Sequence, residues 1–199
     1  MTHLYKLVRW DNKWHCEFRG DPLCSKQGNI LSFSNKEIIN KVLANESPHK
    51  SLSYNLCSDI IDENYLTFQE VWSDLTYKAL AIKKESELNL NIPDYMDFLR
   101  QSNILLLNQS SVLNQFKLFF NKLYNQLSLQ NKVLATHLIY LKLEPSCTIL
   151  YLLNQLDLEG YIESLAYIQH IRLGHKVEKY KKNLSTNVRD LIKFKYYLS

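Results

Sequence analysis

Between Leu129 and Lys182 the sequence is apolar for most of its length, and no other segment limits the possible folds as strongly. Two short polar breaks, Glu144-Pro145 and Asp157 to Gly160, divide this segment and predict two or three helices. After the proline, apolar residues cover most of a helix surface: Ile149, Leu150, Leu152, Leu153 and Leu156. A helix that is apolar nearly all round is usually buried. We therefore expect this segment to form the core of a helical body.

The residues up to Phe33 carry a different pattern, in which short β-prone runs alternate with turn residues. Leu4 to Trp10 and Trp14 to Phe18 flank the turn pair Asp11-Asn12, which predicts a β-hairpin. Alternation of Trp14, Cys16 and Phe18 predicts a half-buried second strand. Further turns are expected at Gly20 to Pro22 and at Gln27 to Asn29. Together these signals predict a small antiparallel sheet.

Helices are predicted along the rest of the chain from apolar residues at helical spacing and from capping residues. Ser34 or Asn35 caps the first helix, and Pro48 ends it. The other helices outside the core segment are expected at Leu52–Ile61, Phe68–Ala81, Pro93–Leu99, Val112–Leu127 and Val188–Leu198. The predicted fold class is α+β. A small antiparallel β-rich N-terminal domain with its closing helix, residues 1–50, precedes a larger all-helical C-terminal domain, residues 51–199.

Composition and terminal residues narrow the class of protein. The formal net charge is +4 and the pI is about 8.7, less basic than the pI above about 9 that is typical of a dedicated nucleic-acid-binding domain. Met1 to Lys6 has the features of neither a secretory signal nor a transit segment. No apolar run approaches the roughly 18 residues that a membrane span needs. We therefore expect a bacterial cytoplasmic protein that does not insert into membranes.

The cysteines favour structural thiols over chemistry. They form no CxxC pair, and each lies in or beside an apolar pattern: Cys16, Cys24, Cys57 and Cys147. Buried free thiols in a reducing compartment are the expected interpretation, ahead of disulfides or metal ligands. A nucleophilic Cys57 or Cys147 paired with a histidine has no local motif in its favour.

Other candidates for chemistry are isolated. His170 and His175 are five residues apart, whereas ligands on one helix face are three or four apart, and no HExxH motif occurs. The four glycines form no phosphate-binding loop. Clustered acids fit solvated turns and helix caps: Asp59, Asp62, Glu63, Glu85 and Glu87. The sequence therefore predicts a non-enzymatic protein with no catalytic residues, no metal and no cofactor.

Basic and aromatic residues leave two interpretations open. The run Lys176, Lys179, Lys181 and Lys182 surrounds Tyr180, and the last predicted helix has a basic side. That side would carry Arg189, Lys193 and Lys195. These cations fit either a solvated helix end or a protein that binds RNA or a membrane surface. The aromatic residues of the predicted sheet fit either a protein-binding patch or core filling: Tyr5, Trp10 and Trp14.

Motifs along the chain then resemble a known family in their order and spacing. Leu56 to Asp62 is similar to a block L-A-N-T-A-I-D, and Ser73 to Ala79 to T-D-L-L-C-Y-R-A with one residue missing. Further blocks match at Arg19–Ser34, Ile92–Phe98, Ser146–Leu156 and Glu163–Tyr180. These blocks resemble the F1-ATPase assembly chaperones that bind the ATP synthase alpha subunit, the ATP-twelve family. The resemblance covers nearly the whole chain.

The chain departs from the family pattern at three places. Ser47 stands where the family has a tryptophan, and Tyr180-Lys181 stands in place of W-G. Arg172-Leu173-Gly174 replaces an acidic cluster. If that cluster helps to hold the client in the family, this chain lacks the acidic residues for the corresponding contact.

The resemblance implies a function and a partner. It implies a chaperone that binds unassembled F1 alpha subunit and prevents its aggregation until beta subunits replace it, without nucleic acid and without a cofactor. The residues to which it points for partner binding are Asp74, Tyr77, Lys78, Arg172 and Tyr180. Asp74 and Tyr77 fit capping or core roles equally well. We expect the protein to be a monomer.

Overall fold

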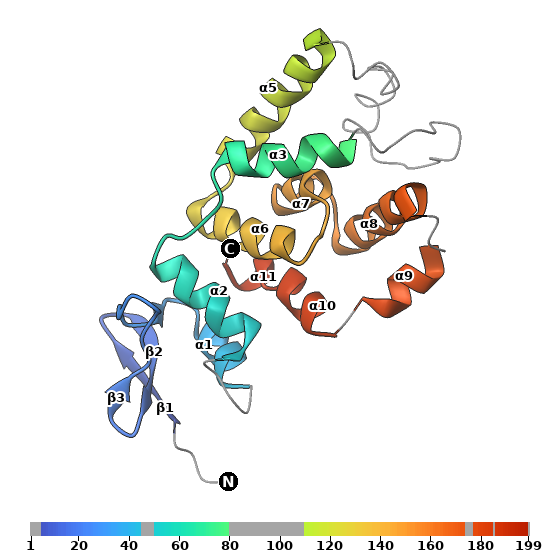
Figure 1. The fold of residues 1–199 in the computed structure, drawn as a ribbon. Coiled ribbons are helices and arrows are strands. Elements are labelled where there is room, and N and C mark those ends of the chain that lie inside the picture. Colours follow the sequence, from blue (N-terminus) through green and yellow to red (C-terminus); the bar gives the residue numbers. More distant parts are fainter. Residues whose placement is uncertain (1–4, 45–49, 80–109, 174–176, 185, 199) are drawn as a thin grey trace.

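The computed structural model describes residues 5–44, 50–79, 110–173, 177–184 and 186–198, and shows an antiparallel sheet followed by helices (Figure 1). The predicted α+β class, with the sheet at the N-terminal side of a helical body, is confirmed. The predicted helix Pro93–Leu99 and the helix stop at Pro48 lie outside the described residues.

The first two strands form a β-hairpin, as predicted. Strand β1 (Tyr5–Trp10) pairs antiparallel with β2 (Lys13–Phe18), with Trp10 opposite Lys13. Asp11 and Asn12 between them have positive φ angles of 45° and 59°. Positive φ at both central residues is the two-residue turn whose twist matches that of the strands, and short polar residues tolerate it best.

Two short strands complete the sheet on the other side of β2. Strand β3 (Asp21–Pro22) and β4 (Ser32–Phe33) both pair antiparallel with β2. The turn before β3 falls on Arg19 and Gly20, whose φ angles are 55° and 96°. The predicted turn at Gly20 to Pro22 is therefore one position too late, because Asp21 and Pro22 already pair with β2.

Two helices lie between the sheet and the rest of the body (Figure 1). Helix α1 (Lys36–Leu43) is capped by Asn35, whose side-chain oxygen accepts a hydrogen bond from the backbone N–H of Glu37 at 3.0 Å. This selects Asn35 over Ser34 as the cap. Helix α1 packs on β2 and β4 with Ile38, Ile39 and Val42 buried. Helix α2 (Leu52–Ile61) packs on α1 and on the helical body.

The helical body contains one buried helix, α7 (Pro145–Leu152), against which several of its other described helices pack. Those other helices are α3 (Phe68–Ala79), α5 (Ser110–Gln126), α6 (Leu129–Tyr140), α8 (Leu158–Leu173), α9 (Val177–Asn183), α10 (Thr186–Lys193) and α11 (Lys195–Leu198). All residues of α7 are buried, and α3, α5, α6 and α8 pack against it (Figure 1). The predicted position of the core is confirmed. The buried apolar side chains form one cluster from the sheet to α7, with members on both sides of residue 50. The domain boundary at residue 50 stays a prediction.

The helix breaks differ partly from those predicted. Pro145 begins α7, as expected for a residue whose missing N–H is not needed in a first turn. The predicted break at Asp157 to Gly160 is too long, because helix α8 already begins at Leu158. The Asp157 carboxylate caps this helix by accepting a hydrogen bond from the backbone N–H of Gly160 at 2.7 Å. The described residues of the core segment form helices α6 to α9, where the sequence predicts two or three helices. The predicted last helix, Val188–Leu198, is divided into α10 and α11 at the buried Phe194.

Candidate functional site

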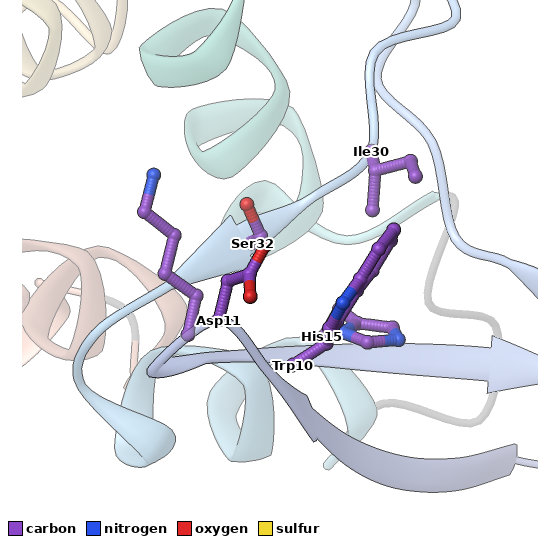
Figure 2. A pocket seen from close by; sticks show the side chains of 6 residues that line it. Trp10, Asp11, His15, Ile30 and Ser32 are labelled. Carbon is purple, nitrogen blue, oxygen red and sulfur yellow. The ribbon is translucent and has the colours of Figure 1, made fainter.

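A small hollow lies beside the hairpin turn of the sheet. It is lined by Trp10, Asp11, Lys13, His15, Ile30 and Ser32 and has a volume of about 250 Å³ (Figure 2). Two of its apolar side chains are solvent-accessible, Trp10 at 64% and Ile30 at 38%. Pockets for small molecules usually measure about 300 to 1,000 Å³. The volume of this hollow is below that range.

His15 lies within the hollow and is itself only 6% exposed. It faces Val8 across the hairpin and Ser32 across the β2–β4 pairing. The Trp10 ring lies edge-on to it, with ring centroids 6.3 Å apart. The alternation predicted for β2 placed only Trp14, Cys16 and Phe18 on a buried face. The alternation does not predict the burial of His15, which points to the other face of the sheet. His15 is buried there because the Trp10 ring lies beside it.

A polar cluster joins the sheet to α2, and we call it the clasp. In it the turn residues Ser25, Lys26, Gln27 and Asn29 contact Ser58 and Asp59 of α2 and its C-cap Asp62. Asp59 in turn contacts His137 of α6. Asp62 accepts from the Ser25 hydroxyl at 2.5 Å and from the Asn29 side-chain amide at 3.0 Å. Desolvation alone would raise the pKa of Asp62, but these and further hydrogen bonds outweigh it and lower the pKa below 3.8.

The second carboxylate of the clasp is buried. Asp59 is 8% exposed, and its oxygens lie 2.8 Å from His137 Nε2 and 3.3 Å from Lys26 Nζ. Burial lowers the pKa of His137 below 6.5, although the hydrogen bond and charge of Asp59 oppose that shift. The expectation that Asp59 and Asp62 are solvated turn or cap residues is therefore wrong for Asp59 and incomplete for Asp62. A buried carboxylate needs such partners because its desolvation is unfavourable by several kcal/mol.

The residues predicted to contact a partner are distributed over three helices. Asp74, Tyr77 and Lys78 lie on α3 and Arg172 lies on α8, and of these four the structure describes the backbone. Tyr180 on α9 is half-buried against the core, and burial raises its pKa above the usual value. Both α3 and α8 pack on α7. Tyr180 thus has a core role, and partner binding by all five residues stays a prediction.

The predicted basic face near the C-terminal side is smaller than expected. The Arg189 guanidinium donates to the carbonyl oxygens of Lys181 and Leu184. Lys195 is 7% exposed, and its ammonium donates to the carbonyl oxygen of Tyr151. The placement of Lys195 on an exposed basic face is therefore wrong. The described lysines of this region that are exposed are Lys179, Lys182 and Lys193.

The thiols are structural in character. Cys16, Cys57 and Cys147 are buried as predicted, whereas Cys24 is half-buried. Burial raises the pKa of Cys16 to about 11 and that of Cys57 and Cys147 further. This is opposite to the lowered pKa of a reactive thiolate. In the described part of the chain, no three His, Cys, Asp or Glu side chains are grouped to hold a metal ion.

These features describe an α+β protein with a small hollow on its sheet and a polar clasp at its sheet–helix junction. Comparison with protein-family models, with curated proteins and with solved structures finds no match to this chain. Across residues 5–198, apart from the gaps named above, no helix is both long and apolar enough to cross a membrane.

Proposed function

We propose that this protein is an assembly chaperone for the F1 sector of ATP synthase, which binds unassembled alpha subunit in the bacterial cytoplasm and prevents its aggregation. The observation that carries the proposal is the ordered resemblance of motifs from Arg19 to Tyr180 to the ATP-twelve family. The layout of a small antiparallel sheet followed by helices is the one that this resemblance implies.

The exposed surface supplies physical support. An interaction surface combines an apolar centre with a polar rim. The hollow has this composition, because Trp10 and Ile30 are exposed beside Asp11, Lys13 and Ser32. An assembly chaperone must also bind its client less tightly than the final partner does. One small hollow with additional contacts from the helical body fits such moderate affinity.

The alternative, a protein that binds RNA or a membrane surface through its basic helices, has less support. Arg189 and Lys195 use their charged groups inside the fold, on backbone carbonyl oxygens. Phosphate binding depends on released counterions and weakens steeply with salt. Fewer available cations reduce the electrostatic attraction on which that alternative depends.

Co-expression with the alpha subunit of the same organism tests the proposal. We expect a soluble complex to co-purify, to persist between about 50 and 200 mM salt, and to release alpha subunit when folded beta subunit is added. Co-expression with the beta subunit alone is the control and should give no complex. An alpha subunit that stays aggregated beside soluble chaperone candidate would overturn the proposal. Binding to RNA or anionic vesicles that is lost steeply over the same salt range would favour the alternative.

A further inference from the structure

The clasp connects the hollow on the sheet to the helical body. We propose that Asp59 and Asp62 are positioning residues, which fix the Ile30 side of the hollow relative to the helical body. One partner can then contact the hollow and the helical body at the same time. The partner in this inference is the alpha subunit, so that part rests on the proposed function. The holding of the turn by α2 is independent of any partner.

Two different sets of hydrogen bonds determine the shape of the turn and its position on α2. Its shape is set internally, because the backbone N–H of Ser25 donates to Asn29 O at 2.7 Å and that of Gly28 donates to Ser25 O at 3.1 Å. Gly28 has a φ of 87°, which glycine adopts without strain. The bonds to Asp62 come from outside the turn and leave this internal set intact. They therefore fix where the turn lies on α2, not how it folds.

The placement of this turn is transmitted to the hollow. Ile30 follows the turn directly and forms a β-bridge with Cys24, while Leu31 N–H donates to Leu23 O at 2.9 Å. Ile30 lines the hollow (Figure 2). A shift of the turn on α2 would therefore move this apolar wall of the hollow.

On its other side the clasp reaches the helical body. Asp59 of α2 accepts from the Lys26 ammonium and contacts His137 of α6 at 2.8 Å. The Lys26 backbone N–H also donates to Ser58 Oγ at 2.8 Å. A continuous series of polar contacts thus runs from the turn that precedes Ile30 through α2 to α6. Apolar packing of α1 and α2 is separate from it, so loss of the clasp should loosen the turn without detaching the sheet.

Fixed geometry has a measurable effect on binding. Two contact areas on one rigid surface bind a partner as a single site, whereas loosely connected areas contribute according to their effective concentration. The clasp should therefore couple the contribution of the hollow to that of the helical body. Trp10, which is exposed in the hollow and outside the clasp, reports on this coupling.

Asp62→Asn tests the holding of the turn without any partner. It keeps the size of the side chain but presents an amide N–H₂ to the groups that now donate to the carboxylate. We expect amide hydrogen exchange at Lys26 and Gln27 to become roughly 10-fold faster, since hydrogen bonds to charged groups are strong. Glu63→Gln makes the same charge change at the adjacent, exposed position and should leave exchange unchanged. If Asp62→Asn does not fold, Asn29→Ala removes one Asp62 bond and leaves α2 intact. Unchanged exchange in the folded variant would overturn the clasp.

A double-mutant cycle with Trp10→Ala tests the positioning role. We expect Trp10→Ala to weaken alpha-subunit binding by roughly 10-fold in the native protein, as for an aromatic contact residue, and clearly less in Asp62→Asn. An equal loss in both backgrounds, with exchange accelerated, would show that the clasp holds the turn without positioning the hollow. If the native protein binds no alpha subunit, the proposed function and the positioning role fail together, and the exchange measurement still decides whether α2 holds the turn.

Discussion

The clasp and the packing around α7 both join segments that are far apart in the sequence, but they do so by different means. In the clasp, the carboxylates of Asp59 and Asp62 collect donors from a surface turn and from α6. Around α7, the join depends on aromatic packing. Tyr151 is fully buried, its ring stacks on that of Tyr161 with centroids 4.6 Å apart, and its hydroxyl donates to Ile192 O at 3.1 Å.

The two joins differ in how far they depend on charged groups. The join around α7 contains two described ionisable side chains, the buried N-cap Glu144 and Lys195, whose ammonium donates to Tyr151 O and lies 4.2 Å from the Tyr151 ring centroid. A cation at the last turn of a helix is favourable, because carbonyl groups there lack partners. The clasp consists of several titratable groups and lies partly in solvent. We therefore expect the packing around α7 to determine whether the protein folds, and the clasp to determine how the sheet is held under given conditions.

The largest effect is expected from Tyr151→Ala. The substitution removes a fully buried aromatic ring and leaves a cavity between α7, α8 and α10, which typically reduces the free energy of unfolding by about 3 to 5 kcal/mol. Tyr151→Phe keeps the ring and removes only the hydroxyl, and should reduce it by about 1 to 3 kcal/mol because Ile192 O loses its donor. Urea denaturation followed by circular dichroism measures both. Nearly equal losses would show that the hydroxyl, and not the packing, dominates this join.

The position of the core was predictable because it depends on local pattern. Ile149 to Leu152 are apolar on every side, and Pro145 marks where their helix begins, so the sequence alone predicts a buried α7. The hairpin was predictable for a similar reason, because Asp11-Asn12 is a turn pair between two β-prone runs. The burial of Lys195 was not predictable, because the sequence gives no sign that the last predicted helix is interrupted at Phe194.

The clasp and the hollow depend on pairings that no local pattern contains. Asp59 resembles any acid near a helix end until His137, 78 residues further along the chain, is placed beside it. The hollow requires the pairing of His15 with Ser32, which brings β4 against β2. The sequence indicates Trp10 as a candidate contact residue, but it does not distinguish Ile30, which also lines the hollow, from a core residue in a strand.

Acidification should separate the two joins next. The folded protein holds His137 with a pKa below 6.5 and Asp62 with a pKa below 3.8. In both cases the unfolded chain binds more protons between the two pKa values, so stability falls as the pH falls. Both contributions are complete at pH 7; that of His137 is lost first, below about 6.5, and that of Asp62 below about 4.

Urea midpoints measured from pH 7.5 to pH 3 test this in variants. In His137→Gln the fall of the urea midpoint near pH 6 should become smaller. In Asp62→Asn the fall at lower pH should become smaller. Burial raises the pKa of the Tyr151 hydroxyl above 10.0, so Tyr151→Phe removes no group that titrates in the acid range. Tyr151→Phe should therefore shift the whole acid profile without changing its shape. A change of shape in Tyr151→Phe would show that acid acts on the packing around α7.

The smallest effect is expected at a third join, between α8 and α9, where the charged side chains are only partly buried. The Lys181 ammonium lies 3.2 Å from a Glu163 oxygen, and the side chains are 28% and 43% exposed. Solvent screens such a pair, and surface ion pairs contribute about 0 to 1 kcal/mol. Glu163→Gln should therefore change the free energy of unfolding by less than about 1 kcal/mol, and the difference should vanish at high salt. Asp62→Asn, measured in the same salt series, should keep most of its effect, because its donors include neutral groups on a fixed turn. Equal salt sensitivity of the two variants would show that the clasp is no more than a surface ion pair, and that geometry adds nothing to it.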